Sequence, residues 1–184
     1  MKQSGIRIRI GISLRTGLRA LDILRLLPGY DVSAEVVLLS AEQLDGGPEQ
    51  LGCDAVLLSE QDFDLARELA EKSFTAVLIL SEDPGALASA CVSEGILLDS
   101  PKRLAEALGA LLALSVRLRR LRKHTSSLRR KLDDTRFVSR AKLLLMTRLQ
   151  MSEEEAHHYI EQTAMDSGRK SREVAESIIR AYEE

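Results

Sequence analysis

Residues 54–81 read DAVLLSEQDFDLARELAEKSFTAVLILS and contain two short apolar runs on either side of an amphipathic stretch. The runs Ala55–Ser59 and Ala76–Ser81 are rich in Val, Ile and Leu, as are the buried strands of a parallel sheet. The intervening Asp62–Lys72 has the length and apolar spacing of a helix that connects them. This stretch therefore predicts a strand–helix–strand unit of the kind that builds a parallel sheet.

The same alternation extends in both directions from this unit. Three more apolar runs predict strands, and three more amphipathic stretches predict helices. The strands are Ile6–Ser13, Ala34–Ser40 and Ile96–Asp99, and the helices are Thr16–Leu27, Ala41–Leu51 and Pro84–Ser93. The alternation predicts an α/β domain with an open, doubly wound, five-stranded parallel sheet over residues 1–101.

The pattern changes after Pro101, where a long series of apolar residues in alternating three- and four-residue steps begins. Such a series is typical of a coiled-coil seam on one long helix. A helix packed on its own domain is the alternative, but the Arg and Lys residues beside the seam leave little other apolar surface. The sequence therefore predicts a coiled-coil linker helix over residues 102–135. Its seam residues are Leu104, Ala107, Leu111, Leu114, Leu118, Leu121, Thr125, Leu128, Leu132 and Thr135.

Charge is segregated along the chain, although the formal net charge is only −2. Residues 102–150 carry 14 Lys and Arg against 3 Asp and Glu, whereas residues 1–101 carry 8 against 16 and residues 151–184 carry 4 against 9. This distribution indicates a polyanionic partner for the basic segment. Like charges beside the seam oppose dimerisation. We therefore expect a homodimer through the coiled coil to weaken at low salt and to be stabilised by a bound polyanion.

Residues 136–184 predict a three-helix bundle, whose first helix, about Thr135–Gln150, continues the long helix. Ser152 and Glu155 form a capping box at the start of the second helix, which Gly168 ends. Ser171 is expected to cap the third helix. Small residues allow these short helices to pack closely, and they are Ala141, Ala156, Ala164 and Ala175.

The motifs of common enzymes are missing from the sequence. It contains no GxGxxG, GxxxxGK[ST], HExxH or GxSxG, and the Gly-rich residues 46–52 lack the Lys of a phosphate-binding loop. His157 and His158 would point about 100° apart on a helix, with no third ligand at suitable spacing. We therefore expect no enzymatic activity, no metal and no cofactor.

The sequence also favours a cytoplasmic location. Cys53 and Cys91 lie far apart in the sequence and belong to no metal-binding cluster, which suits a reducing compartment. No stretch approaches the roughly 18 uninterrupted apolar residues of a membrane span. Arg7 and Arg9 interrupt the N-terminal apolar run, so neither a secretory signal nor a membrane partner is expected.

Five segments near the C-terminus carry a recognisable pattern. They read RAKLLLM at residues 140–146, SEEEA at 152–156, YI at 159–160 followed by TAMD at 163–166, and SREVAESII at 171–179. Over residues 136–182 this pattern closely resembles the ANTAR domain, a three-helix RNA-binding module of bacterial transcription antiterminators. The resemblance implies a dimer that binds paired RNA stem-loops in leader transcripts and prevents a terminator hairpin from forming.

Arginine planes and hydrogen bonds are expected to carry most of the RNA recognition, because the chain has no Trp and only six Phe and Tyr residues. The expected RNA-binding residues lie on the first helix and at the turn between the second and third helices. They are Arg140, Ala141, Lys142, Arg169, Lys170, Ser171 and Arg172. Ala141 would allow close approach, and the Ser171 hydroxyl with the helix N-terminus would hold a phosphate.

Residues 1–101 resemble the receiver domain of response regulators, which has a flavodoxin-like fold. An active receiver holds Mg²⁺ with acidic residues after the first strand and accepts phosphoryl on an Asp ending the third. Here the first strand runs into Ile12, Ser13 and Leu14, with no acidic residue, and Ser59 occupies the acceptor position. Ser81 fits the expected hydroxyl after the fourth strand, but no Lys precedes Pro101. The resemblance therefore implies a pseudo-receiver that is not phosphorylated by the usual route.

Nearby carboxylates do not restore the acceptor, because Asp54 starts the third strand while Glu60 and Asp62 follow it. Without phosphorylation such a protein needs another input, and we hypothesise a regulatory protein partner that masks the receiver or the coiled coil.

Two other functions stay open from the sequence. A helix–turn–helix in which Ser171 opens the last helix suits a DNA-binding response regulator. That helix carries an unfavourable set of carboxylates for a surface between phosphates, namely Glu173, Glu176, Glu183 and Glu184. The other alternative is a protein-interaction scaffold with no nucleic-acid ligand.

Overall fold

The structure is a computed structural model that describes residues 7–30, 32–47 and 51–183. The chain forms two compact units, Met1–Arg122 and Lys123–Glu184. The unit boundary therefore differs from the boundaries at residues 101 and 135 that the sequence suggested. The long helix contributes to both units.

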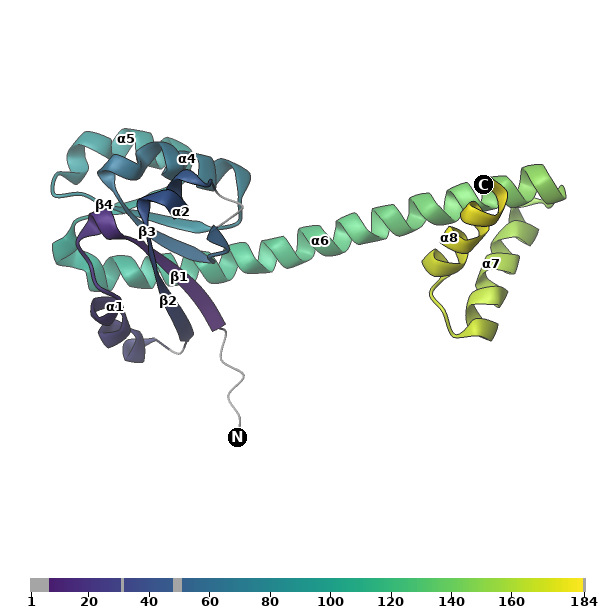
Figure 1. The fold of residues 1–184 in the computed structure, drawn as a ribbon, viewed down its shortest axis with the longest axis horizontal. Helices are drawn as coiled ribbons and strands as arrows, with labels where there is room; N and C mark the ends of the chain where they lie inside the picture. The colour runs from purple at the N-terminus through teal and green to yellow at the C-terminus, as the bar shows by residue number, and fades with distance from the viewer. Residues whose placement is uncertain (1–6, 31, 48–50, 184) are drawn as a thin grey trace. The chain divides into compact units, whose positions relative to one another are not determined.

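A parallel five-stranded sheet forms the centre of the first unit, with strand order β2-β1-β3-β4-β5 (Figure 1). This order is that of the flavodoxin-like fold, which confirms the predicted doubly wound architecture. The predicted first residue of β1, Ile6, lies outside the described residues. The strands are β1 (Arg7–Ser13), β2 (Ser33–Leu39), β3 (Ala55–Ser59), β4 (Ala76–Leu80) and β5 (Leu97–Asp99).

Helices cover both faces of the sheet, so alternate residues of each central strand enter two separate cores. On one face lie α2 (Ala41–Asp45), α4 (Phe63–Lys72) and α5 (Pro84–Glu94), whose side chains pack with Val56, Leu58 and Ile79. On the other lie α1 (Ala20–Leu26) and the first part of α6 (Leu104–Leu149), packed with Ile10, Leu57 and Leu78.

Two helices are shorter than their predicted ranges. Gly17 adopts a left-handed conformation with φ 71°, so a 3₁₀ turn at Leu14–Thr16 precedes α1 instead of a helix that runs from Thr16. Helix α2 ends at Asp45 because Gly46 caps it and Gly47 turns the chain at φ 80°. Residues 48–50 of the predicted helix and Gly-rich loop lie outside the described residues.

The first part of α6 is a helix of the α/β unit. Ala107, Leu108, Leu111 and Leu112 are buried against the sheet, and Leu104, Leu114 and Leu118 pack around them. The sequence assigned five of these residues to a coiled-coil seam. The structure differs because the same three- and four-residue spacing also fits a helix laid on the open face of a sheet. Only beyond Leu118 are the seam leucines exposed, at Leu121, Leu128 and Leu132.

Polar contacts also hold α6 on the sheet. Gly109 allows close approach of Tyr30, since a Cβ at this position would lie 3.1 Å from the Tyr30 hydroxyl oxygen. That hydroxyl donates a hydrogen bond of 2.6 Å to the Ala105 carbonyl. The Arg119 guanidinium donates to the Arg7 carbonyl. These contacts fix α6 against β1 and against Tyr30, which follows the 3₁₀ turn at Leu27–Gly29.

The second unit packs the end of α6 against α7 (Glu153–Ser167) and α8 (Ser171–Glu183), which confirms the predicted three-helix bundle. Its core contains eight buried residues, four of which are the predicted small ones: Ala141, Leu145, Ala156, Ile160, Ala164, Val174, Ala175 and Ile178. The predicted capping box is present, because the Glu155 N–H donates to Ser152 Oγ and the Ser152 N–H donates to Glu155 Oε2. Gly168 ends α7 at φ 63°, as predicted.

Candidate nucleic-acid interface

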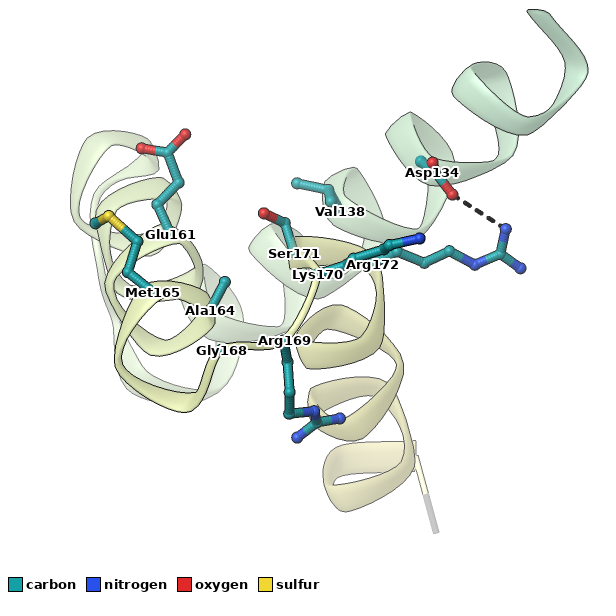
Figure 2. Close-up of a pocket in the computed structure, with 10 residues that line it drawn as sticks. All are labelled: Asp134, Val138, Glu161, Ala164, Met165, Gly168, Arg169, Lys170, Ser171 and Arg172. Atoms are coloured by element: carbon teal, nitrogen blue, oxygen red, sulfur yellow. Dashed lines mark hydrogen bonds and ion pairs between the residues drawn. The ribbon is translucent and has the colours of Figure 1, made fainter. Parts of the chain in front are cut away.

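A hollow of about 660 Å³ lies beside the turn between α7 and α8. All three helices of the second unit contribute to it (Figure 2). Apolar side chains from α6 and α7 supply one part, and the polar residues of the turn supply the other. The lining residues are Asp134, Val138, Glu161, Ala164, Met165, Gly168, Arg169, Lys170, Ser171 and Arg172.

The turn is built by a glycine and two backbone hydrogen bonds. The left-handed Gly168 donates its N–H to Met165 O at 3.2 Å, and the Arg169 N–H donates to Ala164 O at 3.0 Å. This geometry is that of a helix-ending motif in which only glycine is free of strain. The consequence is that the short Arg169–Lys170 link brings three cationic residues to one end of the bundle.

Ser171 does not cap α8, contrary to the sequence prediction. The Lys170 carbonyl accepts hydrogen bonds from the N–H groups of Glu173 at 2.9 Å and Val174 at 3.2 Å, so Lys170 occupies the capping position. Ser171 is the first helical residue, and its hydroxyl forms no hydrogen bond with any described residue. The N–H groups of Ser171 and Arg172 have no acceptor within the helix, which leaves an electropositive helix end at the hollow.

Arg172 is held in place on three sides. Its guanidinium pairs with Asp134 at 3.0 Å and Glu176 at 2.9 Å and lies 4.8 Å from the centre of the Phe137 ring. Hydrogen bonds to Glu176 and then Asp134 raise the pKa of Arg172 above its ordinary value. The dashed line in Figure 2 marks the Asp134 contact. Arg172 therefore joins α8 to α6 and presents a fixed cationic group beside the hollow.

The two remaining turn cations differ in their freedom. Arg169 folds back onto α8, where it donates to the Glu173 carbonyl and to Ser177 Oγ, each at 2.7 Å. Lys170 is exposed and forms no ion pair with the part of the chain that the structure describes. Lys170 is thus the turn cation that is most available to an anion.

The structure does not bring Arg140, Ala141 and Lys142 into this hollow. Ala141 is fully buried in the bundle core, so the close approach that it allows is between helices rather than to RNA. Arg140 donates two hydrogen bonds to Glu183, and Lys142 donates to Glu153 at 2.6 Å. Arg140 and Lys142 are two positions apart on α6, so their side chains leave the helix on different sides.

Sequence reasoning missed the apolar and acidic contributions to the hollow. Asp134 and Val138 lie one helical turn apart on α6, and Met165, 68% exposed, extends from α7. The four-residue spacing of Asp134 and Val138 was the only sign in the sequence that both residues lie on one side of α6. It could not be recognised without knowing which side of α6 the other two helices cover.

At the first unit's sheet edge, where the strands end, the polar side chains bind one another. The buried Asp62 accepts hydrogen bonds from Ser13 Oγ at 2.9 Å and from the Ser59 hydroxyl and N–H at 3.1 and 3.2 Å. Arg15 pairs with the other carboxylate oxygen. Ser59, the degenerate acceptor position, is therefore occupied by a contact within the protein. Asp62 was not expected at this edge because it follows β3 in the sequence, but a 3₁₀ turn at Glu60–Asp62 returns it to the strand end.

The other strand ends are closed in the same way. Ser81 Oγ donates to Glu60 Oε2 at 2.7 Å. Asp99 accepts the Ser100 N–H at 2.8 Å and lies 3.8 Å from the Arg103 guanidinium. The carboxylates at this edge are therefore engaged with protein groups.

The cysteines and histidines offer no alternative centre. Burial raises the pKa of the Cys53 and Cys91 thiols, which lowers their reactivity. Among residues 7–30, 32–47 and 51–183, no cluster of His, Cys, Asp and Glu could hold a metal ion. No helix in these described ranges is long and apolar enough to cross a membrane.

Residues 126–179 match the family described as the ANTAR domain. The matched segment includes part of α6, all of α7 and most of α8, and therefore contains every residue that lines the hollow. ANTAR domains are associated with RNA-binding antitermination, so the match supports an antitermination regulator of this type. No curated protein matches the chain.

Proposed function

We propose that this protein is a bacterial transcription antiterminator that binds paired RNA stem-loops in leader transcripts and prevents a terminator hairpin from forming. The observation that carries the proposal is that the ANTAR match includes an open hollow lined by Arg169, Lys170 and Arg172. The protein would act by binding, in the cytoplasm, without an enzymatic step.

The hollow has the chemistry that an unpaired nucleotide requires. Bases that are splayed out of an RNA loop expose apolar faces and hydrogen-bonding edges that a closed stem hides. Val138, Ala164 and Met165 offer apolar contact to a base face, and the Ser171 hydroxyl offers a hydrogen bond. The Lys170 ammonium and the N-terminus of α8 are suited to the neighbouring phosphate.

A homodimer through the exposed part of the seam would present two such hollows to paired stem-loops. Leu128 and Leu132 are 49% and 63% exposed and lie one turn apart on α6. Two linked binding sites gain from the high effective concentration of the second stem-loop once the first is bound. We expect dimerisation to strengthen with salt and with bound RNA, because both screen the cations beside the seam. Analytical ultracentrifugation at several salt concentrations, with and without RNA, tests this.

We propose that regulation does not use phosphorylation of the α/β unit. The acceptor position holds Ser59, and the neighbouring Asp62 already pairs with Arg15, whose positive charge opposes binding of a divalent cation. A regulatory protein partner is therefore the input that we hypothesise. Incubation with acetyl phosphate and Mg²⁺ should leave the intact mass unchanged, and an acid-labile adduct on any aspartate would contradict the proposal.

RNA recovery and mutagenesis test the main proposal. Crosslinking the full-length protein in cells and sequencing the bound transcripts should enrich leader regions with tandem stem-loops. Lys170→Ala with Arg169→Ala should weaken binding to the most enriched leader at least tenfold, since each charge-assisted contact contributes about 1.5–3 kcal/mol. Binding to an equally long DNA duplex should be weaker, and preference for the duplex would instead favour a DNA-binding response regulator.

The same assay tests the residues of the first helix. Arg140→Ala with Lys142→Ala removes the same number of positive charges without touching the hollow. Loss of hairpin binding at unchanged helicity would support the sequence-based assignment of these residues. Retained affinity would refute that assignment and leave the α7–α8 turn as the contact.

A further inference from the structure

We propose that α6 carries a second RNA contact, a track of Lys123, Arg130 and Lys131 that binds the sugar-phosphate backbone of the stem next to the recognised loop. The inference rests on the proposed function, because it extends the RNA that occupies the hollow along the same unit. All three track residues belong to the unit Lys123–Glu184.

The track residues are exposed and form no ion pair with any described residue. Lys123, Arg130 and Lys131 are all exposed, and none forms an ion pair with the residues in the described ranges. Arg140, Lys142 and Arg172 in the same unit, by contrast, each pair with a carboxylate. Cations without internal partners are the ones that can exchange their counterions for phosphates.

Helix geometry places the track in line with the hollow. Arg130 precedes the lining residue Asp134 by four positions, and Lys131 precedes Val138 by seven, so each pair shares one side of α6. Lys123 precedes Asp134 by eleven positions, which is close to three whole turns and about 16 Å along the axis. The track is therefore a stripe that leads directly to the wall of the hollow.

Two carboxylates lie between the track and the hollow, but both are neutralised by cations. Asp134 pairs with Arg172 at 3.0 Å, and Asp133 lies 3.9 Å from the Arg136 guanidinium. A phosphate chain that passes from the hollow to Lys131 thus meets no unpaired carboxylate on this part of α6. This continuity favours one RNA molecule that contacts both places.

The exposed leucines face a different side of the helix from Arg130. Leu128 precedes Arg130 by two positions and Leu132 follows it by two, so both leave the helix about 160° away from Arg130. A second protein copy on the leucines therefore leaves Arg130 accessible to RNA, whereas Lys131, three positions after Leu128, borders both surfaces.

The kind of contact follows from the residue types. Lys and Arg side chains that meet an A-form stem contact its phosphates, because the deep, narrow major groove hides the base edges. The track should therefore add affinity that depends on salt and is the same for every loop sequence, whereas the hollow should supply the preference for particular loops.

The test compares two charge-matched triple variants of the full-length protein. Lys123→Gln/Arg130→Gln/Lys131→Gln removes the track, and Arg25→Gln/Arg67→Gln/Lys102→Gln removes three exposed cations from the α/β unit. Gln preserves helix propensity, which circular dichroism can verify. The probes are the leader most enriched by crosslinking, synthesised as tandem stem-loops, and the same RNA with both loops replaced by UUCG.

The expected result is a change in salt dependence. Loss of three phosphate contacts on a double-stranded stem should reduce the slope of log affinity against log salt by about 2.7, so the loss of affinity in the track variant should be about 40-fold larger at 50 mM than at 200 mM salt. The control variant should keep the wild-type slope. Preference for the native loops over the UUCG loops should be unchanged in the track variant.

Three results would overturn the inference or its foundation. A track variant with the wild-type slope would show that the stripe does not bind phosphate, while leaving the proposed function intact. Lost loop preference in this variant would show that the track reads bases. A wild-type protein that does not distinguish native from UUCG loops would instead refute the proposed function itself.

Discussion

The sheet edge of the α/β unit and the α7–α8 turn both collect polar side chains where regular elements end, but they use them in opposite ways. At the sheet edge, Asp62 satisfies Ser13, Ser59 and Arg15 internally. At the turn, Lys170 and the Ser171 hydroxyl have no partner among the described residues. The polar groups at the sheet edge therefore bind one another, whereas those at the turn remain available to a ligand.

Burial explains this difference. Asp62 is 4% exposed, and a buried carboxylate without partners is costly, so its surroundings supply hydrogen bonds from every side. Lys170 remains in water, where an unpaired ammonium costs nothing. An exposed surface such as the turn can therefore keep a site for an external polyanion, whereas the buried sheet edge cannot. In this protein, the polar groups that lack an internal partner indicate where a ligand can bind, whereas the number of charged residues does not.

The largest effect is expected from a substitution that unfolds only the helical bundle, which contains the α7–α8 turn. Leu145→Asp places a charge in the core of the helical bundle, where Leu145 is 1% exposed. The expected destabilisation is at least about 4 kcal/mol, a large share of the stability of so small a unit. RNA binding should be lost and the ellipticity at 222 nm should fall.

Leu143→Asp is the matched control, because Leu143 is 59% exposed and lies two positions away. It should leave helicity nearly unchanged. Equal losses of helicity in both variants would contradict the observed packing of α6 in the bundle.

At the sheet edge, the internal contacts can be removed by replacing Asp62, the carboxylate at their centre. Asp62→Ala leaves Arg15 and two serine hydroxyls without their partner, and we expect the α/β unit to lose about 3 kcal/mol of stability. Urea unfolding followed by circular dichroism measures this loss. The folded Asp62→Ala variant should bind the tandem stem-loop RNA with the same affinity as the wild-type protein. Asp64→Ala, at a 97% exposed carboxylate, should have little effect. A stable Asp62→Ala protein would show that the cluster is not what closes this edge.

The smallest expected effect concerns pH at the start of α7. The hydrogen bond from the Ser152 N–H lowers the pKa of Glu155, and the contact with Lys142 lowers the pKa of Glu153, both below the ordinary value of 4.5. Because the folded pKa is depressed, the stabilisation is present above pH 4.5 and is lost as the pH falls through the lower folded pKa.

Thermal melts of the protein between pH 3 and pH 6 test this expectation. The wild-type midpoint should fall progressively below about pH 4.5. Glu155→Gln with Glu153→Gln should show a shallower decline over the same range, and an identical decline would contradict the assignment of these carboxylates.

The local elements of this protein follow from its sequence. Strands such as Ala55–Ser59 are continuous apolar runs, and α7 begins at Ser152 and ends at Gly168 through short-range hydrogen bonds. The ANTAR-like pattern was also readable, since it depends on residues close in the chain. Each of these features is set by interactions within a few positions, and these interactions are encoded by residue type and spacing.

Only the tertiary structure decided which partners these elements meet. The leucine spacing of α6 fits a sheet and a second helix equally well, and contact with Leu57 and Leu78 assigns its first part to the sheet. Likewise, burial of Ala141, the return of Asp62 to the strand end and the freedom of Lys170 depend on distant residues. Sequence periodicity fixes which side of a helix is apolar or charged, but packing in three dimensions determines whether that side meets protein or remains available to RNA.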